Sequence, residues 1–191
     1  MEKYSDEELV EKILKRDFEA LGELFKRYEV SFYNLAYRFT GDHYSSDDLA
    51  SEIFLRIYRY LPSFKKGSQF RPWAMKVAAN TCLTRTKQIS NSQSQISSFT
   101  IKDETGEEKE IEIADKKINL EKDYFKKKMN ERVRRALLDL PVNYRLALYF
   151  YFWEDFSYDG IARILGIPLN TVKTHIKRGK AKLKSELTGL L

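Results

Sequence analysis

Residues 161–184 hold the most one-sided charge of this 191-residue chain, with many Lys and Arg residues but no Asp or Glu. Two short helical patterns meet inside this segment at Gly166, a residue type that accepts the left-handed backbone of a tight turn. Ala162 lies four residues before this glycine and Val172 six after it, where small side chains let two helices approach closely. The spacing predicts a helix-turn-helix whose second helix begins near Leu169.

The second of these helices carries polar and basic side chains on the faces that Val172, Ile176 and Gly179 leave free. In such a helix the first polar residues reach base edges in the DNA major groove, and the later Lys and Arg contact phosphates. A basic face that is merely solvated is the alternative, and the helix-turn-helix spacing argues against it. We expect contacts with duplex DNA from Asn170, Thr171, Lys173, Thr174, Lys177 and Arg178.

The segment SFKKGSQFRPW, residues 63–73, alternates aromatic with basic side chains. This mixture is typical of surfaces that hold single-stranded nucleic acid, because rings stack on bases while cations bind phosphates. The alternative, that Phe70 and Trp73 belong to the hydrophobic core, stays open. Lys76 and Asn80 follow on the next predicted helix. The residues expected to contact nucleic acid here are Phe64, Lys65, Lys66, Phe70, Arg71, Trp73, Lys76 and Asn80.

A third pattern is the stripe of Asp48, Glu52 and Arg56, which recur every four residues and therefore share one face of a predicted helix. An exposed ladder of acids and bases contributes only tenths of a kcal/mol, and that is one interpretation. The other is a docking surface for a protein partner. Composition alone does not separate the two.

Periodicity and composition predict an all-α protein, since only four Pro and eight Gly interrupt long stretches of Leu, Lys, Glu and Arg. A capping box at Ser5 and Glu8 predicts the start of the first helix, and helical periodicity continues to Tyr28. Further helices are expected at 30–40, 48–61, 70–87, 123–139 and 142–153, before the helix-turn-helix. The expected N-caps are Ser45, Ser46 or Asp47 for the helix at 48–61, and Ser157 for the helix-turn-helix.

The composition changes abruptly at residue 88, where Ser, Gln and Asn dominate and an acidic run follows. Few apolar residues and high charge are typical of flexible linkers. A short hairpin between the apolar residues near 100 and 112 is the alternative. We therefore expect two small helical domains, 1–87 and 122–191, joined by a flexible linker at 88–121.

The charge distribution favours a nucleic-acid partner. The net charge is +6, and residues 126–191 alone carry 14 Lys/Arg against 6 Asp/Glu. Such a basic region fits polyanions, with an anionic membrane surface as the second choice. One Cys excludes an intramolecular disulfide, and two distant His make a metal site unexpected. No signal peptide and no apolar run of about 20 residues is visible, so a cytoplasmic protein without a cofactor is expected.

Three segments together resemble the extracytoplasmic-function (ECF) group of bacterial RNA polymerase sigma factors, over about 5–87 and 128–187. SSDDLASEIFLRIYRYL is similar to the family's polymerase-binding helix, SFKKGSQFRPWAMKVAAN to its promoter-melting segment, and LDLPVNYRLAL with FSYDGIARILGIPLNTVKTHIKRGKAKLK to its C-terminal helix-turn-helix. The positions that match the polymerase-binding helix are Asp48, Leu49, Glu52, Phe54, Leu55 and Arg56. Those that match the melting segment are Phe64, Phe70, Trp73 and Asn80.

The resemblance implies a non-catalytic subunit that directs promoter-specific initiation. Its first domain would bind the clamp coiled coil of core RNA polymerase, open the −10 element and hold a flipped base. Its second domain would bind the flap and read the −35 element as duplex. The resemblance also implies an anti-sigma partner, often membrane-bound, and no small-molecule substrate.

Two other function classes use parts of the same pattern. A free-standing helix-turn-helix regulator would use the same basic helix, with the first domain as a sensor or dimerisation unit. The stripe at 48–56 and the aromatic–basic segment argue against it, since a duplex-only binder needs neither. An enzyme is disfavoured because the sequence shows no Ser–His–Asp signature, metal-ligand cluster or phosphate-cradling Gly loop.

Overall fold

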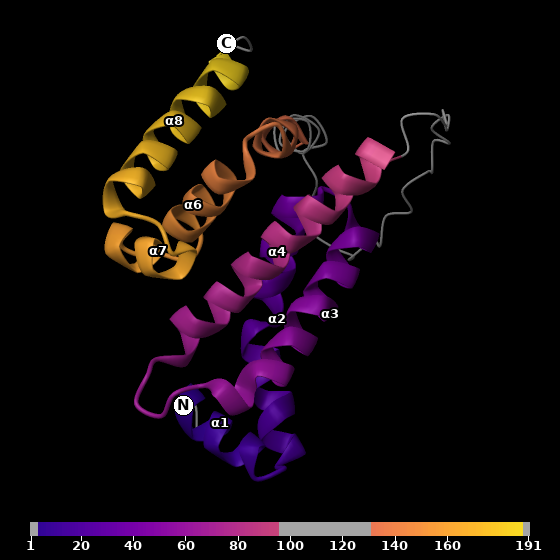
Figure 1. Ribbon diagram of the computed structural model, residues 1–191, viewed down its shortest axis with the longest axis vertical. Coiled ribbons are helices and arrows are strands. Elements are labelled where there is room, and N and C mark those ends of the chain that lie inside the picture. Colours follow the sequence, from indigo (N-terminus) through magenta and orange to yellow (C-terminus); the bar gives the residue numbers. More distant parts are fainter. Residues whose placement is uncertain (1–3, 96–130, 189–191) are drawn as a thin grey trace, which may run out of the picture.

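The computed structural model describes residues 4–95 and 131–188, and all regular secondary structure in these ranges is helical, which confirms the predicted all-α class. We call residues 4–95 the N-terminal domain and 131–188 the C-terminal domain. The N-terminal domain contains α1 (Asp6–Leu14), α2 (Phe18–Thr40), α3 (His43–Tyr60), the 3-10 turn η1 (Leu61–Ser63) and α4 (Phe70–Gln95) (Figure 1). The C-terminal domain contains helical residues 131–138, α6 (Val142–Phe152), α7 (Tyr158–Leu165) and α8 (Leu169–Thr188).

The capping box predicted at the first helix is present. The Ser5 hydroxyl accepts a hydrogen bond from the Glu8 amide at 3.2 Å, and the Glu8 carboxylate accepts one from the Ser5 amide at 2.7 Å. The helical pattern is nevertheless interrupted before Tyr28, because Arg16 adopts a positive φ of 70° and ends the first helix. Asp17 then caps α2, where its carboxylate accepts a hydrogen bond from the backbone of the third helical residue.

The predicted N-caps of the third helix were wrong. The chain turns at Gly41, whose φ of 84° ends α2, and Asp42 rather than a residue at 45–47 caps α3. Its carboxylate accepts a hydrogen bond from the Ser45 amide at 2.8 Å. A helix therefore begins as soon as a side-chain acceptor follows the turn, five residues earlier than the apolar periodicity indicated.

Three long helices build the core of the N-terminal domain, and α1 packs on α2 and α4 at one end. Burial of each large apolar side chain contributes roughly 1.5–3 kcal/mol to folding. On α4 the inward positions are mostly small, which lets this helix lie close to α3. The buried residues include Leu24, Phe32 and Leu35 of α2, Leu49, Ile53 and Ile57 of α3, and Ala74, Met75, Ala78 and Cys82 of α4.

The C-terminal domain contains the predicted helix-turn-helix. Ser157 caps α7 as expected, and Gly166 ends it with a φ of 65°. Val172 and Ile176 of α8 are buried against α6 and α7. Gly179 completes the contact, because a Cβ there would lie 2.9 Å from a methyl carbon of Leu148. Gly179 therefore allows α8 to cross close to α6.

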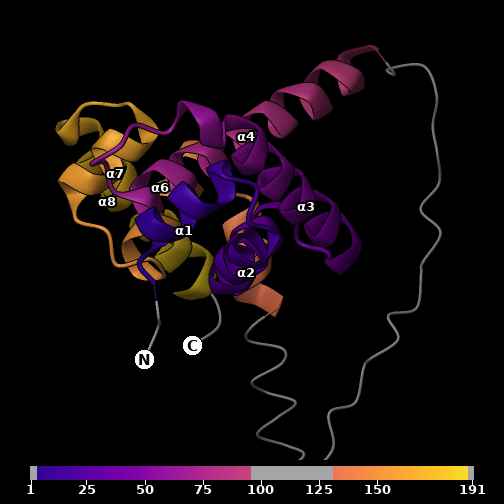
Figure 2. The same cartoon turned by 90° about the horizontal axis from the view of Figure 1, so that it is seen from below.

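The two domains are in direct contact. Helix α7 lies beside the first half of α4, and α6 lies against α2 (Figures 1 and 2). The Tyr149 hydroxyl is 2.8 Å from the carbonyl oxygen of Ser31, and the Arg145 guanidinium donates to the carbonyl oxygen of Phe39 at 2.9 Å. These contacts join residues more than a hundred positions apart, which sequence patterns did not predict.

The helix expected at 70–87 is longer in the structure. Helix α4 continues to Gln95, past the expected end at 87, so the Ser/Gln-rich segment begins as helix. The remainder of the predicted linker, the possible hairpin and the first part of the helix expected at 123–139 lie outside the described residues. Among the helices of the described ranges, none combines the length and apolar character required to cross a bilayer.

Candidate nucleic-acid and polymerase interfaces

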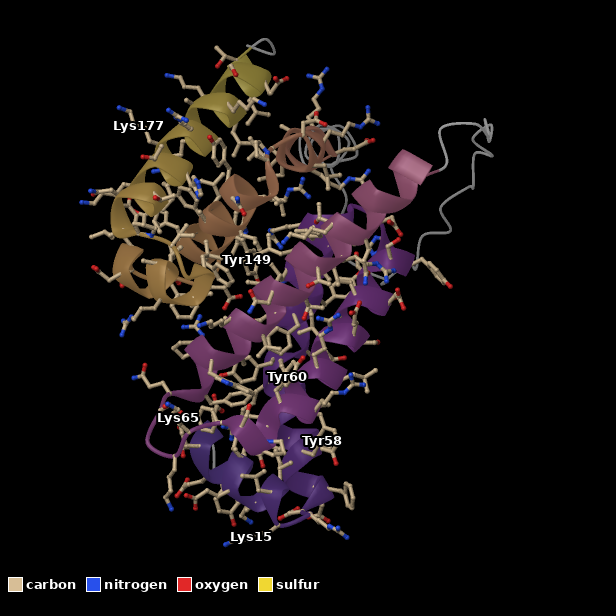
Figure 3. The ribbon with its side chains drawn as sticks, viewed as in Figure 1. Lys15, Tyr58, Tyr60, Lys65, Tyr149 and Lys177 are labelled. Carbon is tan, nitrogen blue, oxygen red and sulfur yellow. The ribbon has the colours of Figure 1, made fainter. Side chains whose placement is uncertain are left out.

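Helix α8 presents the residues predicted to contact duplex DNA on its outer side. Figure 3 shows Lys177 pointing away from the N-terminal domain. Five of the six predicted side chains are exposed and Thr171 is half-buried. The hydroxyl of Thr174 also donates to the Asn170 carbonyl at 2.9 Å, within the helix. No acidic residue occurs on this helix before Glu186, so its field toward solvent is positive along most of its length.

Two other residues of α8 contact aromatic rings of α6. The Lys180 ammonium lies 4.9 Å from the ring centroid of Phe152, a cation–π contact that holds it beside α6. His175 is half-buried, with its ring 5.0 Å from that of Tyr144. Burial lowers the pKa of His175, and the charge of Arg178 lowers it further. Both effects favour the neutral imidazole, so His175 contributes little to the charge of the basic face.

The aromatic residues of the segment at 63–73 form one cluster with unequal exposure. Phe70 is 1% exposed and packs on Tyr28, Phe64 and Trp73 at centroid distances of 5.4, 6.0 and 5.7 Å. The core alternative is thus correct for Phe70, which has no free face for stacking in this structure. Phe64 and Trp73 are half-buried and lie 5.3 Å apart, edge to face. Phe70 therefore supports these two rings from below.

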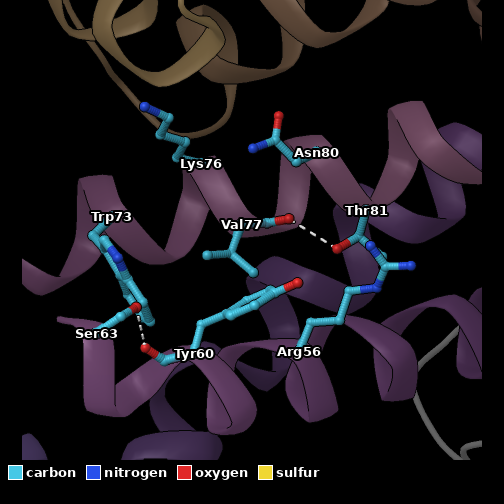
Figure 4. Close-up of a pocket in the computed structure, with 8 residues that line it drawn as sticks. All are labelled: Arg56, Tyr60, Ser63, Trp73, Lys76, Val77, Asn80 and Thr81. Atoms are coloured by element: carbon cyan, nitrogen blue, oxygen red, sulfur yellow. Dashed lines mark hydrogen bonds between the residues drawn. The ribbon is translucent and has the colours of Figure 1, made fainter.

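A hollow of about 360 Å³ opens between α3 and α4, next to this cluster (Figure 4). Tyr60, 48% exposed, and Trp73 give it ring faces, Asn80 gives it an amide, and Arg56 and Lys76 give it positive charge. Ring faces suit a base, an amide suits its hydrogen-bonding edge, and cations suit the adjoining phosphates. The full lining is Arg56, Tyr60, Ser63, Trp73, Lys76, Val77, Asn80 and Thr81.

Sequence reasoning missed Tyr60 and Ser63 as parts of this hollow. Tyr60 comes four residues after Arg56, so it continues the stripe of α3 by one more helical turn. That spacing was the available signal. Ser63 lies in η1, where its hydroxyl donates to the Tyr60 carbonyl at 2.6 Å and fixes the turn under the ring. Its role depends on the turn geometry, which no sequence pattern indicated.

Helix α1 supports the loop between α3 and α4 through two acids. The Glu7 carboxylate accepts a hydrogen bond from the Phe70 amide at 2.7 Å, so a residue 63 positions away caps the start of α4. The Glu11 carboxylate lies 2.8 Å from the Lys66 ammonium, and this hydrogen bond and the lysine charge lower the pKa of Glu11. Of the predicted cations Lys65, Lys66 and Arg71, only Lys65 points into solvent without a carboxylate among the described ion pairs.

Arg71 lies toward the C-terminal domain. Its guanidinium donates to the carbonyl oxygen of Glu154 at 2.7 Å and to the carboxylate of the same residue at 3.0 Å. The guanidinium also lies 4.6 Å from the ring centroid of Phe156. Arg71 was predicted to bind DNA, but in this structure Glu154 occupies the hydrogen-bonding edge of its guanidinium and Phe156 lies against the plane of that group.

The stripe on α3 forms a bridged set of charges. Glu52 pairs with Arg56 at 2.7 Å, and Arg85 of α4 reaches Asp48 at 2.7 Å and Glu52 at 3.8 Å. Leu55, 65% exposed, adds an apolar side chain to this face. Glu52 and Arg56 are half-buried, and Asp48 is exposed; surface pairs of this kind contribute little to folding stability. The surface therefore combines carboxylates with an unpacked leucine, which suits a protein partner better than a polyanion.

Two of the positions that match the polymerase-binding helix point inward. Leu49 is fully buried, so a direct contact with a partner is not available to it in this structure. Phe54 is half-buried and packs on Phe25 and Phe32, with ring centroids 4.5 and 5.1 Å away. Both support the helix from behind. Within the described ranges, no group of three or more His, Cys, Asp or Glu side chains is placed to hold a metal ion.

Comparison with known proteins agrees with this division of the chain. The family model described as Sigma-70 region 2 matches residues 24–90, which include the stripe and the hollow. The family model described as Sigma-70, region 4 matches residues 130–183, which include the helix-turn-helix. The chain belongs to the ECF group of RNA polymerase sigma factors. Helix α1, with Glu7 and Glu11, lies before both matched regions of this sigma factor.

Relatives match the sigma factor over nearly its whole length. It is 25% identical to "ECF RNA polymerase sigma factor SigW" of Bacillus subtilis (strain 168), over 95% of this chain and 96% of the relative. It is 27% identical to "ECF RNA polymerase sigma-E factor" of Escherichia coli (strain K12), over 100% of this chain and 98% of the relative.

Solved structures share the fold. CnrH in complex with the cytosolic domain of CnrY has a TM-score of 0.67 and 19% identity, over 97% of this chain and 99% of that chain. The sigma factor RpoE in complex with the anti-sigma factor NepR from Bartonella quintana has a TM-score of 0.66 and 17% identity, over 87% of this chain and 96% of that chain.

Proposed function

We propose that this chain directs promoter-specific transcription initiation as a subunit of RNA polymerase with no catalytic activity of its own. One observation carries this proposal: a single chain joins an exposed basic recognition helix to a separate hollow large enough for a base. Duplex DNA fits the first and an extruded base fits the second. The domains we propose are 1–95 and 122–191, the first extended from 87 to the end of α4.

The C-terminal domain reads the −35 element as duplex in this proposal. The first turns of α8 carry Asn170, Thr171, Lys173 and Thr174, which enter the major groove and contact base edges. Lys177 and Arg178 follow one turn later and contact phosphates. Because phosphate contacts release counterions, they make this step strongly dependent on salt.

The N-terminal domain opens and reads the −10 element. An extruded base enters the hollow between α3 and α4, stacks on Tyr60 and Trp73, and presents its edge to Asn80. Lys65 and Lys76 hold the neighbouring phosphates, and Phe64 extends the ring surface. Phe70 acts from the core, by fixing the positions of the two rings above it. The interactions are therefore made with single-stranded DNA, after the duplex has opened.

The stripe on α3 is the proposed contact with core RNA polymerase. Asp48, Glu52, Leu55 and Arg56 face outward and would meet the clamp coiled coil, while the C-terminal domain would meet the flap. The site of action is the cytoplasm, where polymerase works. One of the related solved structures named above contains the anti-sigma factor NepR, and the other contains the cytosolic domain of CnrY. We propose that an anti-sigma partner, membrane-bound in the ECF manner, controls this chain as well.

Co-purification with bacterial core RNA polymerase, followed by transcription on a promoter library, tests the proposed function. We expect a stable complex and transcripts that depend on both a −35 and a −10 sequence. Binding to duplex DNA without binding to polymerase would instead assign the chain to the free-standing helix-turn-helix regulators. Polymerase binding without promoter-dependent transcripts would also contradict the proposal.

A further inference from the structure

Glu154 is the one buried acidic residue in the described part of the chain, with 5% of its surface exposed. It lies in the turn between α6 and α7, and it sits against the N-terminal domain. A buried carboxylate is costly unless charges or hydrogen bonds compensate it. Here one carboxylate oxygen lies 3.0 Å from the Arg71 guanidinium and the other 2.6 Å from the Tyr149 hydroxyl.

This arrangement crosses the boundary between the domains. Arg71 lies in the first turn of α4, whereas Glu154 and Tyr149 belong to the C-terminal domain. The Tyr149 hydroxyl is also 2.8 Å from the Ser31 carbonyl of the N-terminal domain. Its single proton therefore lies between two acceptors, this carbonyl and the Glu154 carboxylate of the C-terminal domain. The Arg38 guanidinium, 4.4 Å from the ring centroid of Trp153, completes the cluster.

The partners of Arg71 resemble those that DNA would supply. A carboxylate and a phosphate both offer anionic oxygens to the fork of a guanidinium, and an aromatic ring stacks on its plane as a base does. In this structure the carboxylate comes from Glu154 and the ring from Phe156. The other described hydrogen bonds between the domains, such as that from Arg145 to the Phe39 carbonyl, use neutral backbone acceptors, so only the Arg71 contact mimics an anionic phosphate oxygen.

The contact between the domains is also incompatible with a promoter complex in which α8 binds the −35 element while the hollow binds the −10 element. The −10 and −35 elements lie about 25 base pairs apart, or about 85 Å at 3.4 Å per step. In the structure, Trp73 and Lys76 face Gly160 and Arg163 of α7 across one cleft of about 600 Å³. The domains must therefore separate before α8 and the hollow can occupy their two elements together.

We propose that Glu154 is an internal substitute for a promoter phosphate, which holds Arg71 in the free chain and competes with −10 DNA for it. This inference rests on the proposed function for the identity of the competitor. Opening of the domains and binding of single-stranded DNA are then coupled, because both depend on release of one guanidinium. Removal of the Glu154 charge should favour the open chain and leave Arg71 available.

Fluorescence energy transfer in the full chain tests the closed state directly. Dyes are attached to cysteines introduced by Lys26→Cys and Lys184→Cys, at two exposed positions in different domains. The native Cys82 is buried and therefore protected from labelling. We expect lower transfer efficiency in Glu154→Gln than in the parent chain. Glu186→Gln, the same change at an exposed position of α8, should leave it unchanged. Circular dichroism confirms that each variant is folded.

Binding of a fluorescein-labelled, mixed-sequence single strand to the free chain tests the competition. Glu154→Gln should bind it on the order of five-fold more tightly, because a larger fraction of the chain is competent. Arg71→Ala should also open the chain but should not gain affinity, since it removes the residue for which the anions compete. This exposed substitution keeps the test valid even if Glu154→Gln fails to fold.

Three outcomes would overturn the inference: equal energy transfer in the parent chain and both opening variants, an open Glu154→Gln chain with unchanged affinity, or a gain of affinity in Arg71→Ala. These outcomes do not depend on polymerase. A chain that opens as expected but neither binds polymerase nor supports transcription would contradict the proposed function and leave the Arg71–Glu154 closure intact.

Discussion

Helix α8 and the hollow between α3 and α4 both face DNA in the proposed complex, but they are constructed in different ways. In α8 the predicted contacts follow one another on a single helix, and five of six are exposed. Around the hollow they come from two helices and a loop, and contacts with distant parts of the chain determine which of them are exposed. Phe70 enters the core, and Lys66 and Arg71 meet acids from elsewhere in the chain.

This difference has consequences for how each surface binds. The basic side chains of α8 are separate charges on a rigid scaffold, so the effects of removing them should add and should depend on salt. The hollow depends on rings that support one another, so removal of one ring should affect every interaction with the base. Substitutions in the two regions should therefore differ in magnitude, in salt dependence and in the form of DNA affected.

The largest effect is expected from Trp73→Ala. Removal of a stacking ring should reduce binding of polymerase holoenzyme to forked −10 DNA roughly ten- to hundred-fold, the equivalent of about 1–3 kcal/mol. Trp73→Tyr should recover most of it, since a ring remains. Tyr44→Ala removes an 87% exposed ring elsewhere on the same domain and serves as the control. Equally weakened binding in Trp73→Ala and Tyr44→Ala would show that the hollow does not hold a base.

The double variant Lys177→Ala with Arg178→Ala should come next. It should weaken −35 duplex binding about ten-fold, and the logarithmic salt slope should become shallower by roughly one for each phosphate that is no longer neutralised. Titrations at several salt concentrations give both numbers. Lys15→Ala, at the far end of the molecule (Figure 3), should change neither. An unchanged slope in the double variant would exclude both residues from binding to phosphate.

A smaller effect is expected on the polymerase contact. Asp48→Ala with Glu52→Ala should lower affinity for core polymerase on the order of five-fold, because exposed charges contribute modestly. The fold should be intact, since both pairs lie at the surface. Glu19→Ala with Glu29→Ala removes the same charge from exposed positions of α2. If both double variants bind polymerase like the parent chain, the docking stripe is wrong.

The smallest effect is expected from Glu7→Gln on α1. Removal of a negative charge from the N-terminus of α4 costs about 0.3–1 kcal/mol, so open-complex formation should slow by about two- to five-fold. Stopped-flow measurements on assembled holoenzyme give this rate, and −35 duplex affinity should not change. Glu29→Gln is the matched control. Slower opening in both variants, or in neither, would remove α1 from the support of the loop.

The same contrast explains what the sequence could predict. Gly166, Ser157 and Val172 act on neighbours a few residues away, so the helix-turn-helix and its exposed face were predictable. The start of α3 was missed because Asp42 supplies a cap earlier than the apolar pattern indicates. Hydrophobic periodicity also leaves open which aromatic residues of a loop are buried, and Phe70 proved to be one of them.

Contacts over long sequence distances were beyond prediction. Glu7 caps a helix that begins 63 residues later, and Arg71 pairs with Glu154 at a separation of 83 residues. No local pattern marks either acid, because each looks like an ordinary charged residue in its own segment. These two acids nevertheless decide how the loop before α4 is held and where its arginine points.

The most direct test of two separate DNA readers is a crossed binding measurement. Holoenzymes made with the parent chain, with Trp73→Ala and with the Lys177→Ala, Arg178→Ala double variant are titrated by fluorescence anisotropy against −35 duplex and against forked −10 DNA. We predict that Trp73→Ala weakens binding to the fork alone and that the double variant weakens binding to the duplex alone. If either protein binds both DNAs more weakly to the same extent, the account of two independent readers is contradicted.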